Sequence, residues 1–150
     1  MDDLDRALAL IGEHADEGDF VGRQPAETVE AAESALGLTF PPTYRRFLQE
    51  LGAGDIAGDE FYGVVDTSFG GRPPDAVGRT LEARERVGLP DRYVIVGDTG
   101  DGDWYVVDTS QGDGPVLIFM PGVPEEDAGP PERVAEDFGA FLAQMVTDSL

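Results

Sequence analysis

The chain has 150 residues, 41% of them hydrophobic, which is enough for one domain that buries its own core. It contains no cysteine, and this excludes disulfides, thiolate metal sites and cysteine catalysis. Asp and Glu number 31 against 10 basic residues, all of them Arg, so a formal net charge of −21 argues against nucleic acid and anionic membranes as partners.

The first third of the chain predicts two helices joined by a linker. An apolar stripe indicates an opening helix that ends by Gly18; it consists of Leu4, Leu8, Ile11 and Ala15. Residues 19–25 are expected to form the linker and residues 26–36 the second helix. Gly37 follows where a left-handed C-terminal cap is needed.

A third helix is predicted after Pro41 and Pro42, because proline cannot continue a preceding helix but suits the first turn of a new one. Its apolar stripe recurs at spacings of three and four: Tyr44, Phe47, Leu48 and Leu51. Gly52 is expected to end it.

After Gly54 the pattern changes to that of strands. Strands are predicted at 60–65, 92–97, 104–108 and 115–120, the last three joined as an antiparallel meander by turns rich in Gly and Asp. Between the first and second strands, residues 70–74 predict an exposed loop and residues 80–87 a short helix capped by Thr80.

The chain ends in a proline-rich loop, residues 121–131, and a predicted final helix. The apolar face of that helix is expected to contain Val134, Phe138, Phe141, Leu142 and Met145. Helices thus flank a run of strands. This order predicts a single α+β domain over residues 1–150, with one central, mainly antiparallel sheet of about four to six strands between N-terminal helices and a C-terminal helix.

Catalytic and metal-binding patterns do not emerge from the sequence. His14 is the only histidine and is predicted to lie on the surface, so a Ser-His-Asp triad is disfavoured. Residues 98–103 bring acids into a Gly-rich loop, but their spacing differs from that of an EF-hand and fits a tight hairpin turn. We therefore expect no enzyme activity, no cofactor and no metal site.

Residues 32–54, AESALGLTFPPTYRRFLQELGAG, resemble the SMI1/KNR4 family, also called the SUKH superfamily. The likeness continues in order through four further pieces: Glu60 to Val65, Leu89 to Val96, Gly97 to Asp108, and Gly114 to Phe119. It covers nearly the whole chain from about residue 25 and agrees with the predicted α+β order.

This resemblance implies a binding protein. Bacterial members are implicated as immunity proteins that sequester polymorphic toxins, often nucleases, and eukaryotic members as regulatory or scaffold modules in cell-wall synthesis and signalling. A basic toxin encoded nearby is the expected partner, since an acidic surface attracts basic proteins. The alternative is a regulatory or scaffold module.

The partner-binding residues are predicted from charge and expected exposure: Asp55, Asp59, Glu60, Asp98, Asp101, Asp103, Glu125, Glu126 and Asp127. The acidity has a second explanation, because the absence of Lys and Asn indicates a GC-rich genome, and a halophilic proteome gives the same charge balance. The N-terminus has acids where a signal peptide needs basic residues, so a cytoplasmic protein is expected.

Overall fold

The computed structural model describes residues 2–70 and 72–150. The helices are α1 (Asp3–Glu13), the short 3-10 helix η1 (Ala15–Glu17), α2 (Ala26–Leu36), α3 (Pro42–Glu50), α4 (Ala76–Val87), α5 (Glu125–Ala128) and α6 (Phe138–Ser149). The strands are β1 (Gly18–Phe20), β2 (Gly54–Ile56), β3 (Asp59–Phe61), β4 (Tyr93–Asp98), β5 (Trp104–Asp108), β6 (Val116–Phe119) and β7 (Glu132–Ala135).

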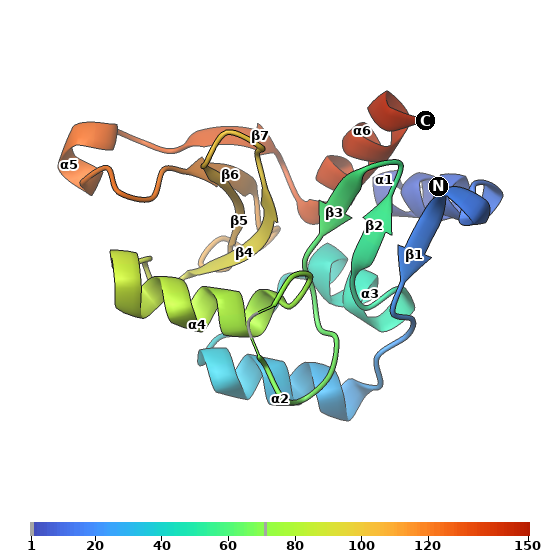
Figure 1. Ribbon diagram of the computed structural model, residues 1–150, viewed down its shortest axis with the longest axis horizontal. Helices are drawn as coiled ribbons and strands as arrows, with labels where there is room; N and C mark the ends of the chain where they lie inside the picture. Colours follow the sequence, from blue (N-terminus) through green and yellow to red (C-terminus); the bar gives the residue numbers. More distant parts are fainter. Residues whose placement is uncertain (1, 71) are drawn as a thin grey trace.

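These strands form two antiparallel sheets, one of three strands in the order β1-β2-β3 and one of four in the order β4-β5-β6-β7. The α+β class and the antiparallel meander are therefore confirmed. Where one central sheet was expected, the strands divide between two sheets that lie side by side (Figure 1). A backbone hydrogen bond from the Tyr62 N–H to the Val96 carbonyl, 2.8 Å long, ties one sheet to the other just past the end of β3.

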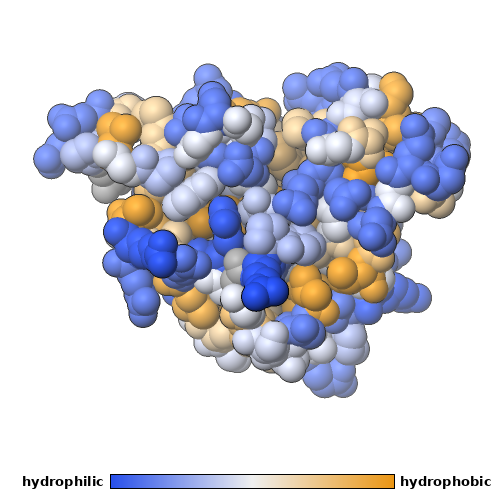
Figure 2. Space-filling model, viewed as in Figure 1, coloured by the Kyte–Doolittle hydropathy of each residue, from blue (hydrophilic) through white to orange (hydrophobic). Residues whose placement is uncertain are grey.

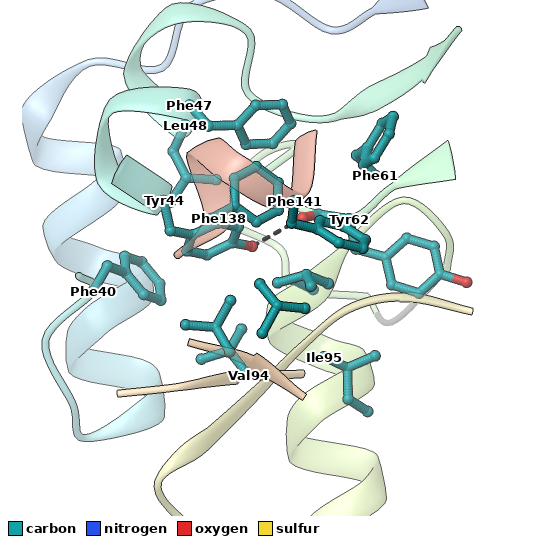
Figure 3. Close-up of a cluster of buried hydrophobic side chains, with 14 of the residues drawn as sticks. Phe40, Tyr44, Phe47, Leu48, Phe61, Tyr62, Val94, Ile95, Phe138 and Phe141 are labelled. Carbon is teal, nitrogen blue, oxygen red and sulfur yellow. Dashed lines mark hydrogen bonds between the residues drawn. The ribbon is translucent and has the colours of Figure 1, made fainter. Parts of the chain in front are cut away.

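An aromatic cluster fills the space between α3, α6 and the two sheets (Figure 3). Tyr44 and Phe47 come from the predicted stripe of α3, and both rings pack on Phe138 of α6 at centroid distances of 4.9 and 4.8 Å. The Tyr44 hydroxyl donates a hydrogen bond of 2.9 Å to the Tyr62 carbonyl. The core thus reaches the junction of the two sheets and fixes the backbone there.

The helices that local signals define are confirmed. α2 has the predicted bounds, and Gly37 caps it in the left-handed region at φ 70°. Pro42 opens α3 as expected. In each case the residues that set the helix boundary lie within one or two helical turns of it.

Several expectations for other elements are wrong; the strand expected at 60–65, for example, is Asp59–Phe61. α4 begins at Ala76 because the Asp75 carboxylate accepts hydrogen bonds from the Val77 and Gly78 N–H groups and caps it. Thr80 is buried inside the helix, and its hydroxyl accepts a hydrogen bond from the Ile95 N–H. Val134 lies in β7 rather than on the final helix, since its segment pairs with β6. The predicted linker contains part of β1, which pairs with β2.

Candidate functional site

An acidic surface is assembled around the β2–β3 hairpin. Asp55 on β2 and Glu60 on β3 are direct cross-strand partners, and both are exposed. Residues opposite each other in an antiparallel pair project to the same face of the sheet. The hairpin therefore presents two carboxylates side by side, although like charges in this position disfavour the pairing.

The junction between the sheets brings a second acidic segment to the hairpin. Because the backbone at Tyr62 bonds to Val96, the end of β4 lies next to β3. A hollow of about 320 Å³ opens there, with Asp59, Glu60 and Asp98 among its acidic lining and Tyr62, Tyr105 and Phe141 among its aromatic lining. The acids are thus gathered around an aromatic floor.

The acids around this hollow shift the pKa values of neighbouring groups. The slight burial of the Glu60 carboxylate raises its pKa, the charges of Asp55 and Asp98 raise it further, and Arg79 opposes them. Burial likewise raises the pKa of Tyr105, with added contributions from three carboxylates: Asp59, Asp101 and Glu132. Asp55, Asp59, Glu60, Asp98 and Asp101 consequently share one negative field, which we call the acidic surface.

One cation contacts the aromatic floor of this surface. The Arg79 guanidinium from α4 lies 5.5 Å from the centre of the Tyr62 ring. Burial raises the pKa of Tyr62, while Arg79 lowers it. Arg79 therefore offsets part of the acidic field and covers one side of the Tyr62 ring.

The loop between β4 and β5 holds its acids by turn interactions. The Asp98 carboxylate accepts a 2.7 Å hydrogen bond from the Gly100 N–H, and the Thr99 N–H donates to the Asp103 carbonyl at 3.0 Å. The Thr99 hydroxyl donates to Asp101, which lowers the pKa of that carboxyl group. The interpretation of residues 98–103 as hairpin-turn chemistry agrees with these contacts.

The remaining predicted site residues lie elsewhere. Asp103 lines a different hollow, beside β6 and the segment 120–131. Glu126 and Asp127 are exposed on α5, which projects from the four-stranded sheet at the left of Figure 1, away from the β2–β3 hairpin. Glu125 belongs to the same helix, but its side chain lies outside the described part of the structure.

Sequence reasoning missed three charged residues at the acidic surface: Arg79, Glu132 and Asp19, which is exposed and pairs directly with Asp55. Glu132 acts on Tyr105 only because β7 pairs with β6, and a four-residue strand after a proline-rich loop gives almost no periodic signal. Arg79 lies in the first half of α4, before the expected start of that helix at Thr80. The sequence signal that would have placed Arg79 in this helix is Asp75, a residue type that caps helix N-termini, followed by apolar residues.

Other candidate chemistry finds little support in the described ranges. The His14 Nδ1 lies 2.8 Å from the Glu17 carboxylate, on the surface as predicted. Within residues 2–70 and 72–150, no three His, Asp or Glu side chains are arranged to hold a metal ion. In the same ranges no helix combines the length and the apolar character needed to cross a bilayer.

The fold and this site define a small α+β protein whose acids converge on a partly aromatic, solvent-facing surface. A family model described as SMI1-KNR4 cell-wall, SUKH_6, matches residues 26–142. The chain therefore belongs to the SMI1/KNR4 family of the SUKH superfamily. The match includes every residue of the acidic surface.

Proposed function

We propose that this protein is a non-enzymatic binder, of the immunity-protein kind, that neutralises a basic toxin domain by covering it with the acidic surface. The observation that carries the proposal is the cross-strand pair Asp55 and Glu60, set beside Asp98. A like-charge pair of this kind costs stability on the order of 0.2–1 kcal/mol relative to a neutral one. A partner that supplies the missing positive charge recovers this cost on binding.

The mechanism is occlusion with electrostatic steering. A basic catalytic cleft, such as that of a nuclease, is drawn toward the acidic surface, and such steering raises association rates by about 10- to 10³-fold at low salt. Tyr62 and Tyr105 supply aromatic area within the same surface, which is the usual material of interface anchors. Binding of this type needs no catalytic group from this chain.

The test is co-purification with the product of the neighbouring gene, followed by rescue of cells from its toxicity. The informative variants are Asp55→Lys and Glu60→Lys, made singly. Each places a lysine opposite the remaining acid, which favours the hairpin, so a loss of binding does not come from unfolding. Matched controls are Glu27→Lys and Glu30→Lys, exposed positions on α2 with the same charge change.

We expect the two hairpin variants to weaken binding by about tenfold or more, mainly through slower association, and the α2 controls to change it far less. Equal effects of all four variants would overturn the assignment of the surface. Binding of a cellular protein without toxicity rescue would favour the regulatory or scaffold module instead.

A further inference from the structure

A second hollow, apolar in character, lies on the four-stranded sheet. It has a volume of about 380 Å³ and is formed by the start of β4, the end of β6 and the segment 120–131. Tyr93, Phe119, Met120, Val123 and Pro130 contribute apolar surface to it. Figure 2 shows apolar atoms between the projecting segment and α4 at the left of the view, bordered by hydrophilic residues.

The wall of this groove is built of packed aromatic rings. Phe119 contacts Tyr93 edge to face at 6.2 Å and stacks on Trp104 at 5.9 Å. Rings held on both sides keep their orientation, so the groove is formed in advance of binding. Its volume matches that of sites which take up one large side chain or a small ligand.

Two acidic residues are part of the groove's lining. Asp103 lines it from the β4–β5 loop, and Glu132 lines it from β7. Neither side chain forms an ion pair with any residue in the described ranges. Arg92, the cation that lies over the Tyr93 ring, is already placed 4.0 Å from the Asp108 carboxylate.

The groove is connected to the acidic surface through the β4–β5 loop. Asp103 follows Asp98 and Asp101 in one loop, and Glu132 adds to the negative field around Tyr105. An apolar pocket lined by acidic residues that form no ion pair within the described ranges has the usual arrangement of an interface core with its polar rim.

We propose that this groove receives an apolar side chain, flanked by Lys or Arg, from a basic protein partner. The inference rests on the proposed function and names the anchor of that interface. Charge complementarity selects the occupant: acids at the groove repel an acidic segment, and a second copy of a chain with net charge −21 is repelled as a whole.

The test uses synthetic peptides as probes, so it does not depend on identifying the toxin. The peptide Lys-Arg-Phe-Arg-Lys, capped at both ends, is titrated into the full chain and followed by amide chemical shifts, with Lys-Arg-Ala-Arg-Lys and Glu-Glu-Phe-Glu-Glu as comparisons. We expect the Phe peptide to bind about tenfold more tightly than the Ala peptide, with shifts concentrated at the groove residues. The acidic peptide should not bind.

Val123→Arg is the decisive variant, because Val123 is 40% exposed and its replacement puts a cation at the groove without touching the core. Val21→Arg is the matched control, since Val21 is 47% exposed just beyond β1, outside the groove. We expect Val123→Arg to abolish the preference for the Phe peptide and to weaken capture of the neighbouring gene product about tenfold. Val21→Arg should leave the preference for the Phe peptide unchanged.

Other outcomes overturn the inference. Shifts spread over the acidic surface without a Phe preference would show charge attraction alone, and concentration-dependent shifts without peptide would indicate self-association. If the neighbouring gene product binds and Val123→Arg leaves its affinity unchanged, the groove is not the anchor while the proposed function stands. If that product fails to bind but the Phe peptide occupies the groove, the toxin assignment fails instead.

Discussion

Gly63, at the junction of the two sheets, is a position where adding a single methyl group should strongly destabilise the fold. Its φ is not in the left-handed region, so space alone decides the outcome. A Cβ there would lie 1.9 Å from the Gly52 carbonyl oxygen and 2.8 Å from a Leu48 methyl carbon. The Gly63 backbone is held in position by two hydrogen bonds of 2.8 Å: its N–H donates to the Pro74 carbonyl, and its carbonyl accepts from the Ala76 N–H.

The Gly63→Ala variant must therefore separate two backbone segments by about an ångström. Overpacking of this kind costs about 1–3 kcal/mol. The separation also breaks the 3.1 Å hydrogen bond from the Val64 N–H to the Gly52 carbonyl, and an unsatisfied buried group costs about 1–3 kcal/mol more. We expect the free energy of unfolding to fall by about 2–6 kcal/mol, a large share of the roughly 5–15 kcal/mol typical of a domain.

The assay is urea unfolding followed by circular dichroism, with Gly12→Ala as the control. Gly12 is exposed in α1, and a Cβ there meets nothing within 4 Å. Alanine favours a helix over glycine by up to about 1 kcal/mol, so this same substitution should stabilise the protein. A Gly63→Ala protein within about 1 kcal/mol of the wild type would refute the steric argument.

Three further predictions concern the core and the charges. Tyr44→Phe keeps the ring but leaves the Tyr62 carbonyl without its donor, and we expect a loss of about 1–3 kcal/mol in urea unfolding; an unchanged midpoint would show that the carbonyl finds another partner. Folding raises the pKa of Glu60, so its ionisation costs stability as pH rises through the ordinary value of 4.5 and the raised folded value. Glu60→Gln should therefore stabilise the protein at pH 7 and lose that advantage below the ordinary pKa, whereas a pH-independent difference would contradict the shift. Salt at about 1 M shortens the screening length to about 3 Å, so we expect the melting temperature to rise with salt at net charge −21; a flat response would show that self-repulsion does not limit stability.

The salt experiment also bears on the origin of the acidity. A large gain in stability at molar salt would fit a halophilic proteome. A small gain in stability, together with strongly salt-dependent binding of a basic partner, would indicate that the acidic residues function in partner binding. The two explanations left open by the sequence are thereby separated by measurement.

The helices could be predicted where their causes are local. α2 and α3 follow from apolar periodicity, a left-handed glycine and two prolines, all of which act within a few residues. The prediction failed at α4 because Thr80 looks like a cap in the sequence, yet its hydroxyl bonds to Ile95 on a distant strand. The cap that does start α4, Asp75, is itself a local signal, which the prediction missed.

The short strands show the limit of local signals. β1, β2 and β3 have three residues each, too few for an alternating pattern to stand out, and they exist because each pairs with a neighbour. The split into two sheets likewise depends on where pairing stops, which no stretch of chain determines alone.

By itself, then, the sequence determined the α+β class, the stripe of α3, the turn chemistry of residues 98–103 and the acidity of the chain. The tertiary structure decided which acids meet. Asp55 and Glu60 are joined by hairpin register, and Asp98 lies near them because β4 packs beside β3, where the Tyr62 N–H bonds to the Val96 carbonyl. Charge is a property of residues, whereas a charged surface is a property of their pairing, because Coulomb energy depends on separation in space and not along the chain.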